Sequence, residues 1–132
     1  EREPEVVELA RAWFGLDAIP NTTVHVADGA SFVERAAPGS WDIVVLDAYD
    51  ASRSSPAFVS RDFLAALKRA LRPGGAVAYN VIGTLGRAGP VSELVRAARS
   101  LFHDVRVVPV MGCDEEFVAD ALRNVVVVAK RD

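Results

Sequence analysis

The chain has 132 residues, of which 51% are apolar and 25% charged, and its formal net charge is −3. This length suits one domain rather than two, and the composition is that of an ordinary globular protein. Both charge signs are interspersed and no basic block is present, which argues against nucleic acid as a partner. A carboxylate-lined cleft in such a mildly acidic protein could still attract a cationic substrate.

Cysteine usage and hydropathy exclude several further classes. Cys113 is the only cysteine, so neither an internal disulfide nor a thiolate metal cluster can form. A single thiol fits a reducing compartment, and we expect a cytoplasmic location without a membrane partner because no apolar run approaches spanning length. The opening Glu1-Arg2-Glu3-Pro4 contains neither a signal peptide nor an initiator Met, which predicts that the true N-terminus lies elsewhere.

Helical and extended patterns alternate along the chain, with Gly and Pro residues between them. In chain order they predict a helix over 4–14, a strand over 23–27, a short helix through 32–33, a strand over 41–46, a polar loop over 47–55, a helix from 60 to 71, a strand over 76–81, a helix from 90 to 101, a strand over 105–110, a loop or short helix over 113–122, and a strand over 124–130.

The alternation predicts an α/β fold with a mostly parallel sheet. The continuous apolar run Ile43–Leu46 is typical of a strand that is covered on both faces. The last two predicted strands are joined without a convincing crossover helix, so the final strand is expected to be antiparallel.

Four segments in register carry a resemblance to a known family. They are residues 1–11, Val26-Ala27-Asp28-Gly29, residues 41–50, and Leu71-Arg72-Pro73-Gly74-Gly75. In this order they resemble spermidine synthases and their relatives, which have the Rossmann-like fold of S-adenosylmethionine-dependent methyltransferases. The resemblance implies the sheet order 3-2-1-4-5-7-6 with an antiparallel last strand. It implies that residues 1–132 form the C-terminal part of one such domain, lacking strands one and two.

The segments that the resemblance places before Glu1 include the glycine-rich loop that binds the cofactor and an N-terminal β-hairpin domain. Without strands one and two, strand three would lack a partner and two apolar edges would be open, which favours pairing with another chain. We therefore expect this chain to be completed by a preceding segment or by a second copy in a homo-oligomer, and to be inactive alone.

Three carboxylates fall at the carboxyl ends of predicted strands, where open α/β sheets bind ligands. The resemblance implies that Glu1 accepts the ribose hydroxyls of a nucleoside, with Glu3 as the rival position. It implies that Asp28 accepts the adenine amino group, while Gly29 lets the base approach the backbone. Asp28 could instead, or also, cap the short helix that follows it.

The segment after the second apolar strand carries the predicted catalytic acids. The resemblance implies that Asp47 and Asp50 take a proton from the attacking amine and hold the cationic substrate. Tyr49 and Asn80 are the predicted substrate-binding residues. Spermidine synthases usually have two serines between the acids, whereas Ala48-Tyr49 stands here, and Arg53 adds a positive charge nearby.

The function implied is transfer of an aminopropyl group from decarboxylated S-adenosylmethionine to a polyamine acceptor. The alternatives are an S-adenosylmethionine-dependent methyltransferase of a small molecule and a non-catalytic domain that keeps the scaffold for binding. No metal is expected, because His25 and His103 lie in different elements and no Cys/His spacing suits a metal site.

Overall fold

The computed structural model describes residues 1–50, 53–54 and 56–132, and the side chains among these outside 49–56. The chain divides into two compact units, Glu1–Arg35 and Ala36–Asp132, which are described separately below. None of the helices in the described part of the chain is long and apolar enough to cross a membrane.

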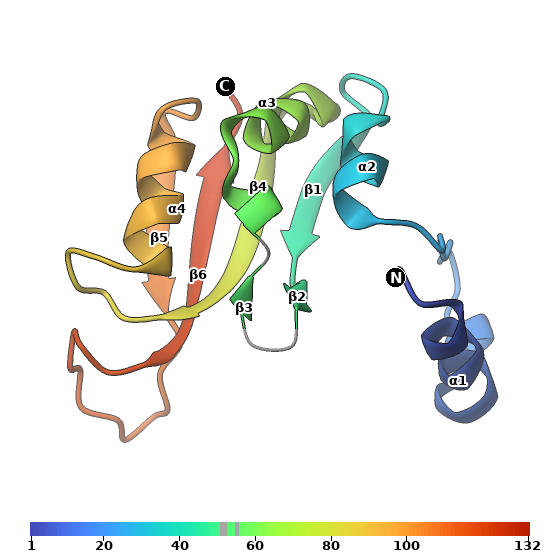
Figure 1. The fold of residues 1–132 in the computed structure, drawn as a ribbon, viewed down its shortest axis with the longest axis horizontal. Helices are drawn as coiled ribbons and strands as arrows, with labels where there is room; N and C mark the ends of the chain where they lie inside the picture. The colour runs from blue at the N-terminus through green and yellow to red at the C-terminus, as the bar shows by residue number, and fades with distance from the viewer. Residues whose placement is uncertain (51–52, 55) are drawn as a thin grey trace. The chain divides into compact units, whose positions relative to one another are not determined.

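The first unit contains two helices and a short 3-10 turn (Figure 1). Helix α1 (Pro4–Phe14) ends at Gly15, whose φ of 66° is left-handed and suits glycine. The 3-10 turn η1 (Leu16–Ala18) follows, and α2 (Gly29–Glu34) closes the unit. The predicted helices over 4–14 and through 32–33 are therefore confirmed.

The predicted strand over 23–27 is wrong, because the structure assigns no strand there. The segment instead forms two backbone hydrogen bonds with a single residue, Glu1. The amino group of Glu1 donates to the His25 carbonyl at 3.3 Å, and the Ala27 amide donates to the Glu1 carbonyl at 2.8 Å. These two bonds are the pattern of a parallel pair. A single partner residue cannot form a ladder, so strand propensity in 23–27 finds too little to pair with.

The second unit is an α/β layer structure. Its elements, in chain order, are β1 (Trp41–Leu46), β2 (Tyr49–Asp50), β3 (Arg53–Ser54), η2 (Pro56–Val59), α3 (Arg61–Ala70), β4 (Leu71–Gly83), α4 (Pro90–Arg99), β5 (Asp104–Pro109) and β6 (Arg123–Lys130).

Four strands form one sheet in the order β1-β4-β6-β5. Strand β4 pairs in parallel with β1, and β6 runs antiparallel to both β4 and β5. Three strands therefore share one direction and the last is reversed, as Figure 1 shows. The predicted fold class, a mostly parallel sheet with an antiparallel last strand, is confirmed.

Strand β4 begins earlier than predicted, at Leu71 rather than Ala76, and it includes the Pro73-Gly74-Gly75 segment. The pairing with β1 shifts register across this segment. A side chain at Gly75 would place its Cβ 2.8 Å from the Asp42 carbonyl oxygen, so only glycine fits against β1 at this point.

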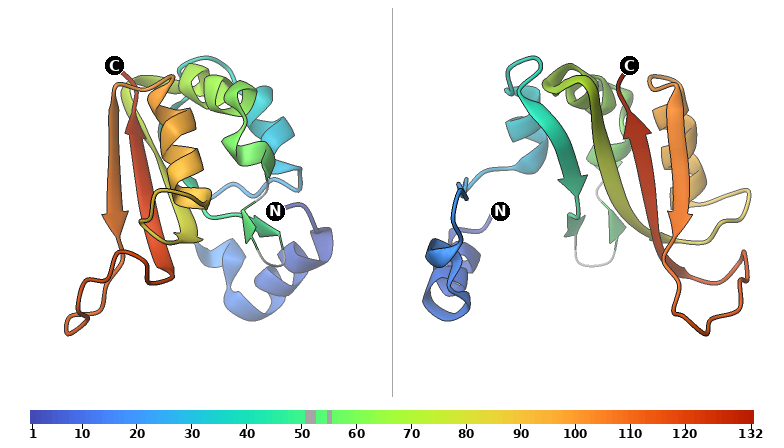
Figure 2. Two further views of the ribbon diagram at one scale, coloured as in Figure 1. Left: turned by 60° about the vertical axis from the view of Figure 1, so that its left-hand side comes forward. Right: turned by 180° about the vertical axis from the view of Figure 1, so that it is seen from behind.

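Helices α3 and α4 pack on one face of the sheet (Figure 2). Ser60 caps α3 as predicted, because its Oγ accepts a hydrogen bond from the Phe63 amide at 3.2 Å. The side chains of both layers bury one apolar core, whose fully buried members include Leu64, Leu67, Leu94, Val77, Val125 and Val127.

Within the second unit, no helix covers the other face of the sheet, as the view from behind in Figure 2 shows. Ile43 and Val45 on β1 are 70% and 69% exposed. Within the second unit, no described element packs over these outward residues of β1. The expectation that β1 is covered on both faces stays a prediction.

Candidate active site

Asp47 and Asn80 meet at the carboxyl edge of the sheet. Asp47 directly follows β1, and Asn80 lies in β4 one residue beyond Tyr79, which pairs with Leu46 in the parallel register. The Asn80 side-chain amide nitrogen Nδ2 donates a hydrogen bond to Asp47 Oδ1 at 2.9 Å. Asp47 is exposed, so a molecule arriving at this edge can reach its carboxylate. The structure thus brings together two of the predicted site residues, which are 33 positions apart in the sequence.

The next predicted residues lie on a short hairpin rather than a loop. Tyr49 pairs with Ser54, and Asp50 pairs with Arg53, in the antiparallel β2–β3 pair. The prediction of a loop over 47–55 is therefore corrected at these positions. The side chains of Tyr49, Asp50 and Arg53 lie outside the described residues, so their proposed roles stay predictions.

Glu1 uses its carboxylate locally. Its Oε1 accepts hydrogen bonds from the Glu3 amide at 2.9 Å and the Arg2 amide at 2.6 Å. These amides, Glu3 first, hold the pKa of the Glu1 carboxyl below its ordinary value. The rival residue Glu3 has its own ion pair with Arg2 at 3.1 Å. Both of these amide bonds use the same carboxylate oxygen of Glu1, Oε1.

Asp28 is the N-cap of α2, which confirms the capping role considered for it. Its Oδ1 accepts from the Ser31 amide at 2.8 Å, and this bond lowers the pKa of the Asp28 carboxyl. Gly29 is the first residue of α2. Because the Ala27 amide is bonded to the Glu1 carbonyl, Glu1 and Asp28 lie on neighbouring backbone segments of the first unit.

Sequence reasoning missed Arg123, the first residue of β6. It is the one charged residue in the buried class among those described, and it contacts the loop that joins β5 to β6. The signal was present in the chain, since Arg123 shares the inward alternation of Val125, Val127 and Ala129.

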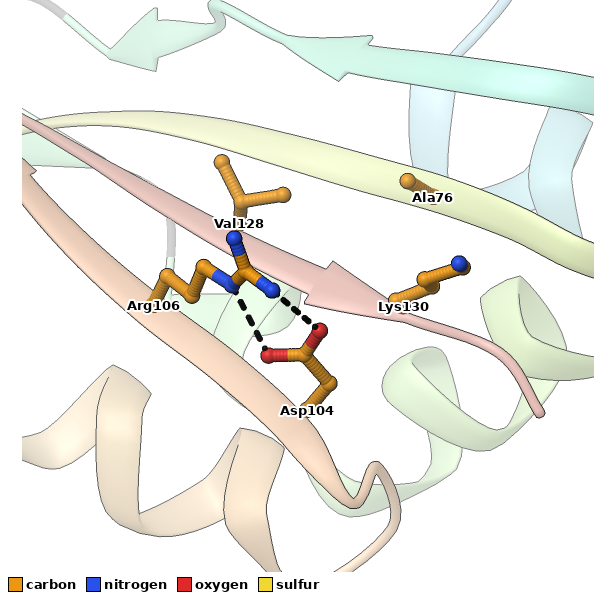
Figure 3. Close-up of a pocket in the computed structure, with 5 residues that line it drawn as sticks. All are labelled: Ala76, Asp104, Arg106, Val128 and Lys130. Atoms are coloured by element: carbon orange, nitrogen blue, oxygen red, sulfur yellow. Dashed lines mark hydrogen bonds and ion pairs between the residues drawn. The ribbon is translucent and has the colours of Figure 1, made fainter.

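A hollow of about 260 Å³ lies on the face of the sheet that α3 and α4 leave uncovered (Figure 3). It is lined by Ala76, Val128, Lys130 and the paired side chains of Asp104 and Arg106, whose ion pair measures 3.1 Å. Ala76 is near the start of β4 and four residues before Asn80. The hollow therefore lies toward the amino edge, away from the Asp47–Asn80 pair.

The two histidines have packing and ion-pair contacts instead of ligand geometry. The His25 ring lies 4.8 Å from the Phe32 ring, and His103 Nε2 lies 3.8 Å from a carboxylate oxygen of Asp132. In the described part of the chain no three metal-binding side chains gather.

Comparison with known proteins identifies relatives of the chain. The Polyamine aminopropyltransferase of Nitrosomonas europaea is 29% identical over 111 residues, covering 80% of this chain and 34% of its own length. Putrescine N-methyltransferase 1 of Nicotiana tabacum is 28% identical over 106 residues, covering 77% of this chain and 28% of its own length. The chain thus spans about a third of the length of the curated relatives it matches.

Solved structures share the fold. A probable spermidine synthase from Corynebacterium glutamicum superposes with a TM-score of 0.81 at 23% identity, over 98% of this chain and 45% of that one. A spermidine synthase in complex with the transition state analogue AdoDATO gives 0.72 at 18% identity, over 100% and 45%. A family model described as the spermine/spermidine synthase domain matches residues 3–111. With that match over most of its length, the chain belongs to the spermine/spermidine synthase family.

Proposed function

We propose that this chain is part of a spermidine synthase-like transferase, which moves an aminopropyl group from decarboxylated S-adenosylmethionine to a polyamine. The observation that carries the proposal is the Asp47–Asn80 hydrogen bond of 2.9 Å at the carboxyl edge of the sheet. Family membership supports the reaction class, and two curated relatives are named for chemistry on amines.

The reaction needs a neutral amine, because an ammonium group has no lone pair for attack. In the proposed step the amine nitrogen attacks the methylene carbon beside the donor's sulfonium. A new N–C bond forms, the C–S bond breaks, and methylthioadenosine leaves as a neutral thioether. The proton lost by the amine passes to Asp47, which acts as the general base. The amide of Asn80 orients the Asp47 carboxylate by holding Oδ1, which leaves Oδ2 to face the amine.

The nucleoside part of the donor is assigned to the first unit. We propose that Glu1 accepts from the ribose hydroxyls and Asp28 from the adenine amino group. Each carboxylate has one oxygen engaged by backbone amides, and the second oxygen is the one assigned to the ligand. Gly29 follows Asp28 without a side chain that could meet the base. Asp50 and Tyr49 are proposed to complete the amine side.

Methyl transfer to a small amine is the second candidate. It is favoured by the similarity to putrescine N-methyltransferase 1 and by the Ala48-Tyr49 segment, which departs from the usual serine pair. A non-catalytic binding domain is the third. Completion of the fold by a preceding segment or a second copy, and a cytoplasmic location, stay predictions.

Product analysis separates these functions. The protein as the cell makes it is incubated with putrescine and either decarboxylated S-adenosylmethionine or S-adenosylmethionine, and the products are identified by mass spectrometry. An aminopropylated product supports the proposal, and a methylated product supports the second candidate. A folded protein that binds methylthioadenosine and yields neither product is a binding domain.

A further inference from the structure

The loop between β5 and β6 is tied to the sheet by one buried cation. Arg123 begins β6, and its side chain is only 5% exposed. A buried guanidinium is unfavourable unless opposite charges and hydrogen-bond acceptors compensate it. The groups that compensate Arg123 all come from the loop.

Three consecutive parts of the loop contact this side chain. Nη1 lies 3.0 Å from Glu115 Oε1, and Nη2 donates to the Val118 carbonyl at 3.0 Å. The guanidinium carbon lies 5.8 Å from the centre of the Phe117 ring. The Glu115 contact is an ion pair without hydrogen-bond alignment, and Nε has no hydrogen-bond partner among the described residues. The Arg123 side chain alone thus contacts three of the four residues 115–118.

Further bonds extend this arrangement to both ends of the loop. The second oxygen of Glu115 accepts from the Gly112 amide at 3.1 Å, so the same carboxylate holds the start of the loop and the cation. The Ala119 carbonyl accepts from the Leu85 amide at 2.8 Å. Leu85 belongs to the segment that follows β4. The loop is therefore bound to the chain that leads directly away from Asn80.

Register places the loop at the edge of the sheet that carries the candidate site. Arg123 pairs with Gly83, three residues beyond Asn80 on β4, a separation of roughly 10 Å along a strand. Figure 1 shows the β5–β6 loop leaving the same edge of the sheet as the β2–β3 hairpin. The loop keeps Asp114, Glu116 and Asp120 exposed, a charge that suits a cationic amine.

We propose that Arg123 is a positioning residue for the acceptor amine. It fixes residues 112–121, and these residues form the outer wall of the amine-binding site beside the Asp47–Asn80 pair. This inference rests on the proposed amine transfer. It adds a residue whose contacts with the loop, and not with the reacting atoms, determine how well the acceptor binds.

The test is a double variant, Arg123→Met with Glu115→Leu, in the protein as the cell makes it. Removing both charges together leaves no unpaired charge in the core. The matched control is Arg106→Met with Asp104→Leu, which removes an Arg–Asp ion pair at the opposite edge of the sheet. We expect the Kd of putrescine and the acceptor KM to rise roughly tenfold in the first variant only. The kcat and the Kd of methylthioadenosine should stay unchanged in both.

An unchanged putrescine Kd in the first variant would overturn the inference. Equal weakening of putrescine and methylthioadenosine binding would also overturn it, because such a result indicates a general loss of structure. If the double variant does not fold, Arg123→Lys replaces it, because lysine keeps a positive charge beside Glu115 but lacks the guanidinium fork that also reaches the Val118 carbonyl. It is measured by the same two dissociation constants and by hydrogen exchange of the 112–121 amides. A protein that yields no aminopropylated product, yet binds putrescine less tightly in the variant, contradicts the proposed function and retains the inference. A native protein that does not bind putrescine contradicts both.

Discussion

The two compact units hold their predicted site residues in different ways. In the first unit, Glu1 and Asp28 accept hydrogen bonds from backbone amides no more than three residues away. In the second unit, Asp47 accepts from the Asn80 side chain across 33 residues of sequence. Local amides satisfy carboxylates at many turns and helix starts, whatever the function. The long-range contact exists only because the β1–β4 register aligns the two residues, so it is the stronger pointer to a site.

The largest effect expected from this difference is at Asp47. Asp47→Asn removes the proposed base while keeping a side chain of similar shape, so kcat for amine transfer should fall by about 100-fold or more. Steady-state kinetics in the native protein measure the change. Asp42→Asn is the matched control, because Asp42 sits at the other end of β1 and pairs with Arg72 at 2.8 Å. An unaffected kcat in Asp47→Asn would exclude Asp47 as the base.

The next largest effect is expected on nucleoside binding, where Glu1 and Glu3 are the two candidates for the ribose-binding carboxylate. Glu1→Gln should weaken methylthioadenosine binding roughly tenfold, because a neutral amide oxygen is a poorer acceptor for the ribose hydroxyls than a carboxylate. Glu3→Gln should leave the affinity unchanged, since Glu3 pairs with Arg2. Calorimetry gives both dissociation constants. The reverse ranking would transfer the ribose role to Glu3.

A smaller effect is expected at Asn80. Asn80→Ala removes the donor that orients Asp47, and kcat should fall roughly fivefold while nucleoside affinity stays the same. Asn124→Ala provides the control on the neighbouring strand, where Asn124 is exposed and pairs with Ile82. If Asn80→Ala is as active as the native protein, the Asp47–Asn80 bond has no part in the reaction.

The smallest effect is the acid sensitivity contributed by Asp28. The Ser31 amide holds the folded-state pKa of Asp28 below its ordinary value of 3.8. The ionised carboxylate therefore stabilises the fold above that value, and the contribution is lost as the pH falls through the lower folded-state pKa. Asp28→Asn still caps α2 but does not titrate, so its melting temperature should fall less on acidification. Thermal melts from pH 6 to about pH 2 compare the two proteins, and identical curves would contradict the prediction.

Most helices and strands of the second unit follow from local patterns. Ser60 marks a helix start by capping, and Pro90 marks one because its fixed φ suits the first helical position. Apolar runs mark β1 and β6. All of these signals act within a few residues. The strand over 23–27 failed for the opposite reason, since a strand needs a partner that a local pattern cannot supply. The β2–β3 hairpin was missed because its residues are polar and its pairing is short.

For the candidate site, the sequence determined which residue types stand at the strand ends, and through the resemblance it predicted Asp47, Asn80, Glu1 and Asp28. Only the tertiary structure decided which of them touch. The Asp47–Asn80 bond depends on parallel register, and Arg123 depends for its ion pair and hydrogen bond on the loop between β5 and β6. The first is a contact between segments far apart in the chain, and its geometry is set by packing of the whole sheet rather than by neighbouring residues.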